Sequence, residues 1–505
     1  MSDSRNDLTG GATPLQADLV VTNATAILGG ANGEQYRVVP GTSIEVAAGE
    51  ISWIGPTDSG RATRAAKVVD AKGRIAVAGL VSTHNHAFQN LCKGIGDELA
   101  VWPIVEGVIL ATAEEMNVEE IYIASLACCI EGMRSGRTTL LDFMVGLPDI
   151  EHQRAVLRAF RDSGVRGLLG RATRELHHEA SHRDPWYIPL GEALDQISAL
   201  ASEYDNGLGT PSALPAPGNP RTMTTEGLIR VKEYAVAQGC LTTTHLAEYD
   251  AERVEGHERW GKSTIAKLEE IGFLGPELVA AHCAILDDAE LEALARTGTK
   301  VSYNPVSNCY CGVSIAPVVA MLEMGIDVSV AVDGASVNCQ NMLESLKFGA
   351  LLQKAAYGDA MAINARDMLK LATVGGAQAL GVPDLIGALE VGRLADFFLF
   401  DQWQLNTTPV HDPSSALVYA GGPQNVDTVV IGGDVVLDEG RCTTVDEAAL
   451  IQELQERSVA VSTRAGTVRF LKSRRFTPYG DYERVGIRQP SNGAVPAGAA
   501  LHAQV

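Results

Sequence analysis

Two patterns of apolar and polar residues follow one another along the chain. Residues 18–69 contain short β-type runs separated by Gly, Asn and Pro turn residues, and the runs stand at 19–21, 43–46 and 51–55. This pattern predicts a small antiparallel sheet, which is too short to bury both of its faces alone. The same pattern returns at 395–400 and 426–438, where Gly432 and Gly433 mark a hairpin turn. We therefore expect the two ends of the chain to form one small β-sandwich.

The middle of the chain has a different pattern, in which helical stretches of roughly 12 to 25 residues each lead into a short β-branched or Leu-rich run. A helix expected at 118–135 leads into a strand at 138–143, and a helix expected at 225–238 leads into one at 241–245. Further strands are expected at 278–282, 300–303 and 327–333. About seven or eight such units predict a (β/α)8 TIM-type barrel. A doubly wound open sheet is the alternative, but no Gly-rich phosphate loop follows any of these strands.

Together the patterns predict an α/β protein in four parts. These are the N-terminal part of the sandwich at 1–76, the barrel at 77–385, the C-terminal part of the sandwich at 386–445, and a C-terminal helix and tail at 446–505. The polar residues 1–15 are expected to fray. The Pro- and Gly-rich tail is expected to wrap a neighbour or to be partly disordered.

Composition narrows the range of partners and compartments. The formal net charge of -22 and the pI near 4.9 argue against nucleic acid or an anionic membrane surface as a partner. Nine cysteines without regular spacing are typical of reduced, mostly buried thiols. The sequence shows neither a signal-peptide pattern nor a membrane-spanning apolar run. We expect a cytoplasmic homo-oligomer, a dimer or tetramer, that acts on a small molecule.

Candidate chemistry begins at the end of the apolar run 78–86, where His84 and His86 are separated by one residue. Residues two apart on an extended strand share a face, so both imidazoles would project into one cavity. Imidazole suits zinc, iron or cobalt, but two ligands do not hold a divalent ion. Further ligands must therefore come from other strands.

Other ionisable residues stand at the carboxyl ends of later strands, where barrel enzymes keep their active sites. His245, His282 and Asp333 each end one expected strand, and Glu248 follows His245 by three residues. With the first histidine pair, His245 and Asp333 would supply three imidazoles and one carboxylate, and this set leaves a coordination position open for water. A carboxylate beside that water, here Glu248, is the acid/base that hydrolysis of a carbon-nitrogen bond requires.

Six motifs in this order resemble the metal-dependent amidohydrolase superfamily. Within it they are most similar to the branch of chlorotriazine hydrolases, methylthioadenosine/S-adenosylhomocysteine deaminases and related aminohydrolases. The likeness runs from about residue 18 to 440. The motifs are GLVSTHNH at 79–86, THLAE at 244–248, AHC at 281–283, NPVSN at 304–308, VDGA at 332–335 and GALEVGRLAD at 387–396.

The resemblance implies metal ligation by His84, His86, His245 and Asp333. It also implies that Glu248 shuttles the proton and that His282 polarises the substrate or the attacking water. In the expected mechanism Asp333 and Glu248 take the proton of the water, and His282 stabilises the resulting oxyanion or orients the nucleophile. The expected cofactor is one divalent ion per chain, zinc first, with cobalt, iron or manganese as alternatives. Binuclear relatives bridge two ions with a carboxylated lysine, whereas the only lysine between residues 151 and 240 is Lys232, inside an expected helix.

The predicted function is hydrolysis of a carbon-nitrogen bond, other than a peptide bond, in a small neutral substrate. An aminohydrolase that deaminates a heterocyclic amine is the first hypothesis. A hydrolase of an aryl urea, carbamate or thiocarbamate is the second. A catalytically inactive scaffold is the third, and the intact ligand set argues against it.

The loop after the first barrel strand offers apolar side chains for a substrate pocket, namely Phe88, Leu91, Val101 and Trp102. Burial of Phe88, Leu91 and Trp102 in the core is the alternative. The loop has no Arg pair to clamp a carboxylate or phosphate, and Lys93 is expected to be solvated. A fairly apolar, neutral substrate is therefore predicted rather than a nucleotide or an acidic metabolite.

Several residues depart from the family pattern or carry ambiguous chemistry. Tyr303, Cys309 and Cys311 stand where relatives line the pocket, and the two cysteines are interpreted as small pocket or packing residues. Four further histidines are expected on the surface, with a pocket position as the alternative for the last of them: His177, His178, His182 and His257.

Overall fold

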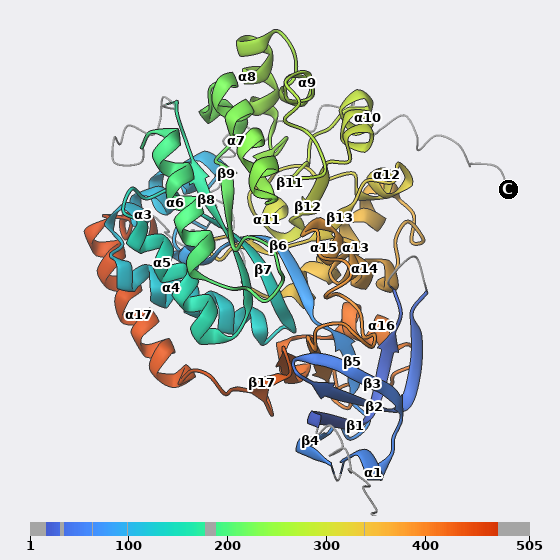
Figure 1. Ribbon diagram of the computed structural model, residues 1–505. Coiled ribbons are helices and arrows are strands. Elements are labelled where there is room, and N and C mark those ends of the chain that lie inside the picture. The colour runs from blue at the N-terminus through green and yellow to red at the C-terminus, as the bar shows by residue number, and fades with distance from the viewer. Residues whose placement is uncertain are drawn as a thin grey trace, which may run out of the picture.

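The computed structural model describes residues 17–472, apart from 31–34, 63, 98, 177–187 and 338. A barrel of alternating strands and helices stands on a sheet built from both ends of the chain (Figure 1). The α/β fold class expected from the sequence is confirmed. The three boundaries between the four expected parts stay a prediction, and the expected frayed start and most of the C-terminal tail lie outside the described residues.

The two chain ends meet in one nine-stranded sheet. Its strands are β1 (Ala17–Leu28), β2 (Arg37–Ala47), β3 (Glu50–Pro56), β4 (Ala65–Asp70), β5 (Ile75–Ala78), β15 (Phe397–Phe400), β16 (Val426–Ile431), β17 (Asp434–Asp438) and β18 (Arg441–Cys442). The ends join where β5 pairs with β1 on one side and with β15 on the other. The sheet is not wholly antiparallel as expected, because β4 and β5 run parallel to β1. The direction of a strand depends on the connection that precedes it, and α1 (Ser59–Ala62) connects β3 to β4. The alternation of apolar and polar side chains is the same in parallel and antiparallel strands, so it could not predict this direction.

Eight strand positions form the barrel, with β13 and β14 sharing the eighth. The strands are β6 (Leu80–His86), β7 (Arg137–Met144), β8 (Arg166–Thr173), β9 (Ala213–Pro217), β10 (Thr242–Leu246), β11 (Leu278–His282), β12 (Lys300–Tyr303), β13 (Val328–Val330) and β14 (Asp333–Gly334). Every hydrogen-bonded pair of these strands is parallel. β14 pairs with β6, where Asp333 lies opposite Asn85. At the β9–β10 seam, Pro215 has no N–H for a ladder, and its carbonyl accepts a hydrogen bond from Thr242 Oγ1 at 2.8 Å.

Helices cover the outside of the barrel. The principal ones are α4 (Val118–Met133), α5 (Ile150–Ser163), α6 (Leu190–Glu203), α7 (Thr225–Gln238), α8 (Asp250–Trp260), α9 (Thr264–Glu270), α10 (Asp288–Thr297), α11 (Pro305–Tyr310), α12 (Val318–Glu323), α13 (Met342–Tyr357), α14 (Ala365–Leu371) and α15 (Val374–Ala379). The start of α4 is fixed by a capping box in which Asn117 and Glu120 exchange side chain to backbone hydrogen bonds. None of the described helices is long and apolar enough to cross a membrane.

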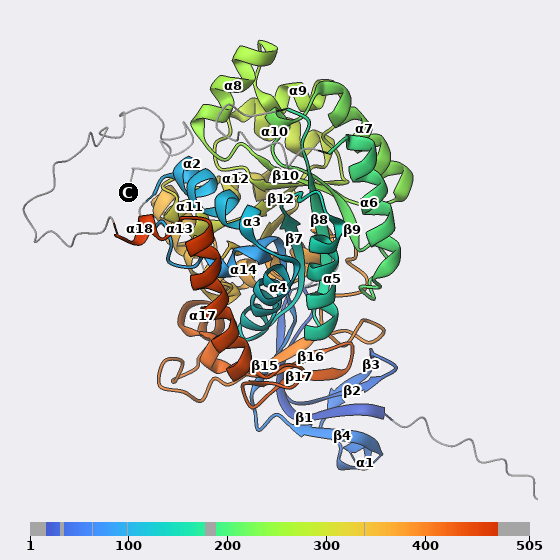
Figure 2. The ribbon, with the colours of Figure 1, turned by 90° about the vertical axis from the view of Figure 1, so that its left-hand side faces the viewer.

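A C-terminal helix, α17 (Glu447–Arg464), packs along α4 on the outside of the barrel (Figure 2). Arg464 donates hydrogen bonds to both carboxylate oxygens of the buried Glu120, at 2.8 and 2.6 Å. Ser458 Oγ donates to the carbonyl of Leu91 at 2.8 Å. The helical segment expected after residue 446 is therefore present and attached to the barrel.

Candidate active site

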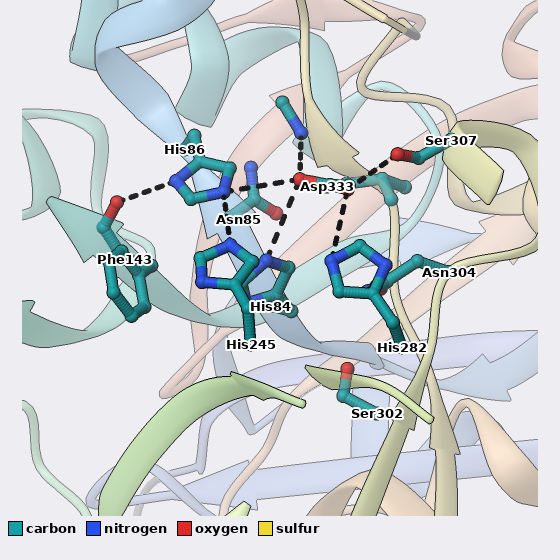
Figure 3. A network of polar contacts seen from close by, with 12 residues as sticks. His84, Asn85, His86, Phe143, His245, His282, Ser302, Asn304, Ser307 and Asp333 are labelled. Carbon is teal, nitrogen blue, oxygen red and sulfur yellow. Dashed lines mark hydrogen bonds and ion pairs between the residues drawn. The ribbon is translucent and has the colours of Figure 1, made fainter. Parts of the chain in front are cut away.

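The carboxyl ends of the barrel strands converge on one cluster of imidazoles and carboxylates. His84 and His86 end β6, His245 lies in β10, His282 ends β11 and Asp333 begins β14. Figure 3 shows the four imidazoles arranged around the Asp333 carboxylate. The structure thus brings together the metal-ligand candidates that the sequence names.

The facing atoms of this cluster are nitrogen and oxygen donors at short range. Asp333 Oδ1 lies 3.6 Å from His84 Nε2 and 3.3 Å from His86 Nε2. Asp333 Oδ2 lies 3.8 Å from His282 Nε2. The donor atoms of His84, His86 and His245 lie within 4.8 Å of one another, and so do those of His84, His282 and Asp333. This spacing allows several of them to reach a single ion.

The hydrogen bonds of two histidines indicate that a cation belongs between them. His86 Nδ1 donates to the carbonyl of Phe143 at 2.7 Å, and His245 Nδ1 donates to the carbonyl of Gly218 at 2.8 Å. Each neutral ring therefore carries its proton on Nδ1 and has a bare lone pair on Nε2. The two Nε2 atoms face each other at 3.3 Å. Two facing lone pairs repel unless a cation lies between them.

His84 completes the fit to a divalent ion. Its ring is fully buried, and both of its nitrogens lie without a hydrogen-bond partner among the described residues. A buried polar group without a partner is costly, which a coordinated cation would relieve. The donor set of imidazole nitrogens and one carboxylate is typical of zinc.

Burial keeps the candidate ligands in the form that binds metal. It lowers the pKa of His84 and of His245 well below the ordinary histidine value, and neighbouring imidazoles lower both further. Burial also lowers the pKa of His86. Burial acts to raise the pKa of Asp333, but the adjacent His86 and His282 hold it below its usual range. His84, His86 and His245 are thus held neutral, and Asp333 is held ionised.

Glu248 and His282 carry a different electrostatic signature beside this cluster. Burial raises the pKa of Glu248. Burial acts to lower the pKa of His282, but the carboxylates of Glu248 and Asp333 raise it above the ordinary value. Glu248 Oε1 lies 3.9 Å from His282 Nε2. Two groups with raised pKa values at this distance are suited to holding and passing a proton.

The backbone is strained where these residues stand. His282 has a φ of 75° and Asp333 a φ of 67°, although neither is a glycine. Such residues are uncommon, and they gather at functional sites where other contacts enforce the conformation. Here Ser307 Oγ donates to Asp333 Oδ2 at 2.6 Å, and the N–H of Gly334 donates to Asp333 Oδ1 at 2.7 Å. These bonds fix the direction of the carboxylate.

Comparison with known proteins is consistent with this geometry. A sequence model of the amidohydrolase family matches residues 75–436, which is more than half of the chain. The chain belongs to the amidohydrolase family. It is 34% identical over 449 residues to a 5'-deoxyadenosine deaminase from Methanosarcina barkeri, covering 89% of this chain and 99% of the relative. It is 33% identical over 444 residues to a 5-methylthioadenosine/S-adenosylhomocysteine deaminase from Syntrophobacter fumaroxidans, covering 88% and 97% of the two chains.

Solved structures support the same fold. An adenosine deaminase from Xanthomonas campestris with bound zinc has 26% sequence identity and a TM-score of 0.78, covering 88% of this chain and 99% of that one. The zinc complex of an atrazine chlorohydrolase from Arthrobacter aurescens has 22% identity and a TM-score of 0.80, with the same coverage. The expectation of a metal-dependent amidohydrolase that acts on carbon-nitrogen bonds other than peptide bonds is confirmed. An inactive scaffold is not supported.

A buried network behind the site of this amidohydrolase was missed from the sequence. Arg137 is fully buried, and its Nη1 donates to Asn85 Oδ1 and to Gln340 Oε1, each at 2.8 Å. Gln340 Nε2 in turn donates to the carbonyl of Asp333 at 3.2 Å. Because Asn85 stands between His84 and His86, the network ties together the two strand ends that close the barrel. The one local signal was an isolated Arg at the start of an apolar strand.

Asn308 was also without an assigned role, although its motif was recognised. Its Oδ1 lies 2.9 Å from His282 Nδ1 and accepts a hydrogen bond from it. This contact orients the ring so that Nε2 faces Glu248 and Asp333. Its position in the motif at 304–308 was the available signal.

A cleft of about 820 Å³, counting its open mouth, leads to His86, His245 and Glu248. Phe88 and Val101 line it, as the sequence suggested. Leu91 instead lies in the core, fully buried, because η2 (Ala87–Cys92) turns it inward. The side chain of Trp102 is outside the described residues. Much of the apolar wall comes from a π-helical segment, η3 (Val105–Leu110).

Other candidates lie away from the cleft. Tyr303 is fully buried and accepts a hydrogen bond from Gln353 at 3.2 Å, and neither Cys309 nor Cys311 lines the cleft. His257 is exposed on α8, whereas His177, His178 and His182 fall outside the described residues. Lys93 is not simply solvated, because it forms an ion pair with Glu131.

Proposed function

We propose that this amidohydrolase deaminates adenine nucleosides whose 5' position is reduced or carries a thioether, replacing the amino group at C6 and releasing ammonia. The proposal is carried by the sequence identity of 34% and 33% to two nucleoside deaminases, which extends over nearly their full length. A heterocyclic carbon that bears an amino group is also the kind of centre that a polarised water can attack. The cleft that leads to the imidazole cluster presents apolar side chains beside a few polar groups, as sites for small molecules do.

In this proposal His84, His86, His245 and Asp333 hold one divalent ion, with zinc as the first choice. When bound, the ion supplies a nucleophile at neutral pH by lowering the pKa of water to about 7. The carbonyls of Phe143 and Gly218 keep the Nε2 lone pairs of His86 and His245 directed at the ion site. Burial of His84 excludes competing hydrogen bonds from water.

The proton path runs through Glu248. Its raised pKa lets Oε1 hold a proton and donate it to the ring nitrogen next to C6 as the carbon becomes tetrahedral. The resulting carboxylate then takes the hydroxyl proton of the tetrahedral adduct and gives it to the departing amine, which leaves as ammonia while the C6 carbonyl forms. The next water to be deprotonated restores the proton on Glu248. His282 Nε2, fixed through Asn308, lies between Glu248 and Asp333 and holds the incoming oxygen in position.

The walls of the cleft suit a neutral nucleoside with an apolar 5' group. Phe88, Val105 and Ile109 give the cleft apolar lining, and Arg174 and Arg221 also line it. Two arginines therefore line the cleft, although the loop after the first strand supplies none. Arg221 forms an ion pair with Glu255 at 2.8 Å, so its charge is partly balanced within the protein.

The substrate prediction is tested by comparing kcat/KM for 5'-deoxyadenosine, 5'-methylthioadenosine, S-adenosylhomocysteine and adenosine 5'-monophosphate. We expect equimolar ammonia from the nucleosides and at least a tenfold preference for them over the doubly charged monophosphate. A strongly acidic protein repels such an anion. Amine release from an aryl urea or carbamate, with no ammonia from any nucleoside, would favour the second hypothesis instead.

The metal prediction is close to one catalytic ion per chain. Lys232 lies on α7, and its Nζ is 2.6 Å from Glu277 Oε2, next to the amino end of β11 and away from the imidazole cluster. It cannot bridge two ions. Elemental analysis of protein purified without chelator, paired with activity, measures the ratio. Two ions per chain, both required for turnover, contradict the assignment.

We also propose that the enzyme works in the cytoplasm as a homo-oligomer. None of the nine cysteines, all of which lie in the described part of the chain, forms a disulfide, and five of them are buried, which is typical of a reducing compartment. Leu322 on α12 and Phe348 and Leu351 on α13 are 37%, 40% and 47% exposed. Exposed apolar side chains of this kind favour association between subunits.

A further inference from the structure

We propose that Glu252 is a positioning residue whose buried carboxylate holds the loop carrying Glu248 in its working conformation. The inference rests on the proposed role of Glu248 as the proton carrier. Glu252 is 2% exposed and does not line the cleft, so it does not touch the substrate. Its influence must act through the backbone.

Both carboxylate oxygens of Glu252 bind consecutive amides of the loop between β10 and α8. Oε1 accepts from the N–H of Ala247 at 2.9 Å, and Oε2 accepts from the N–H of Glu248 at 3.2 Å. A Glu in the first turn of a helix ordinarily caps that helix at its N-cap residue. Here the N-cap is Tyr249, and the carboxylate reaches past it to the two residues before. The contact therefore serves the loop rather than the helix end.

The loop requires such support because Ala247 has a φ of 50°. A residue with a Cβ is strained in this conformation, and it persists only where other contacts enforce it. The carbonyl of Ala247 accepts from the N–H groups of Ala284 and Ile285, at 2.9 and 3.0 Å, just after His282. Glu252 holds the same peptide region from the opposite side. Together these contacts set the separation between Glu248 and His282.

The surroundings of Glu252 do not favour a role in proton transfer. Burial is the largest effect on Glu252 and raises its pKa to about 7. The two backbone hydrogen bonds and the charge of Arg221 act to lower this pKa, and the charge of Glu248 acts to raise it. Its carboxylate is fully engaged by the loop amides and lies outside the cleft. A part in proton transfer would require contact with the substrate, which its position prevents.

The test is Glu252→Gln in the full-length, zinc-loaded enzyme. The amide can accept one N–H but presents its own N–H to the other. We expect kcat to fall roughly 10- to 100-fold, with KM and zinc content within about twofold of the parent. Hydrogen exchange should accelerate at the amides of Ala247 and Glu248 and not along the rest of α8. Glu258→Gln, an exposed change on the same helix, should leave all of these unaltered.

A second change separates positioning from general stability. Ala247→Gly, introduced with Glu252→Gln, lets the loop adopt its positive φ without strain and should recover part of kcat. If Glu252→Gln does not fold, Glu252→Asp replaces it, because the shorter side chain cannot span both amides. The proposal is overturned if Glu252→Gln leaves both kcat and the hydrogen exchange of the loop amides unchanged. It is also overturned if kcat falls only in proportion to the melting temperature and Ala247→Gly does not restore it. If the parent and Glu258→Gln both lack deaminase activity, the proposed function fails instead, and the exchange measurement still decides the role of Glu252.

Discussion

Glu248→Gln is expected to lower kcat for 5'-deoxyadenosine by roughly 10² to 10⁴ while zinc content stays at the parental level. Glutamine keeps the size of the side chain but cannot hold and release the proton. Burial raises the pKa of Glu248, which favours the protonated carboxyl group that this role requires. His282, whose Nε2 lies 3.9 Å from Glu248 Oε1, keeps its own contact to Asn308 in the variant.

The measurement pairs steady-state kinetics with elemental analysis of the same preparation. Glu258→Gln makes the same chemical change on the exposed face of α8 and should retain parental kcat. KM should change little in either variant, because the amide still fills the floor of the cleft. A Glu248→Gln enzyme that turns over at near parental rate would mean that another group carries the proton.

Strand positions were the most predictable part of this fold. β11 and β12 begin and end at the residues expected from the sequence, and α7 also matches its expected range. Buried parallel strands are short continuous apolar runs, so their limits are visible in the local pattern. The polar residues that interrupt such a run at its end are the ones the barrel brings together. For this reason five strand-end residues and Glu248 could be named before the fold was known.

Contacts between residues far apart in the chain were not predictable in this way. Arg137 reaches Gln340 across 203 positions, and the carbonyl of Gly218 binds His245 across 27. The periodicity of apolar residues indicates which face of a strand is buried, but it does not indicate which distant residue contacts that face. The same limit explains the parallel pairing of β4 and the arginines of the cleft, which come from loops other than the one after β6.

Side-chain direction within short irregular segments was a second limit. Phe88 and Leu91, three residues apart, are both buried in the core, but only Phe88 also lines the cleft. Both occupy η2, a 3₁₀-helical turn whose orientation is set by the helices packed on it. A pattern of two apolar residues in a loop does not determine which of them faces the substrate.

The second large effect is expected for His245→Ala, which should lose zinc and activity together. His245 Nε2 faces His86 Nε2 at 3.3 Å, and its Nδ1–H is held by the carbonyl of Gly218, so it is oriented as a ligand and has no other partner for that lone pair. A catalytic ion has few protein ligands, and the loss of one imidazole leaves the site unable to hold it. Activity with zinc in the buffer should fall by at least about 10³-fold, since the ion generates the nucleophile.

Thermal unfolding provides a readout of the His245→Ala variant that does not depend on turnover. A ligand that binds only the native state raises stability by about 4 kcal/mol at a thousandfold excess over Kd. For a chain of this size that corresponds to a Tm increase on the order of 5 °C when zinc is added to the metal-free parent. His245→Ala should show no such increase. His257→Ala, which removes an exposed imidazole from α8, should retain both the zinc and the full increase. One ion per chain and an unchanged zinc-dependent Tm shift in His245→Ala would remove this residue from the ligand set.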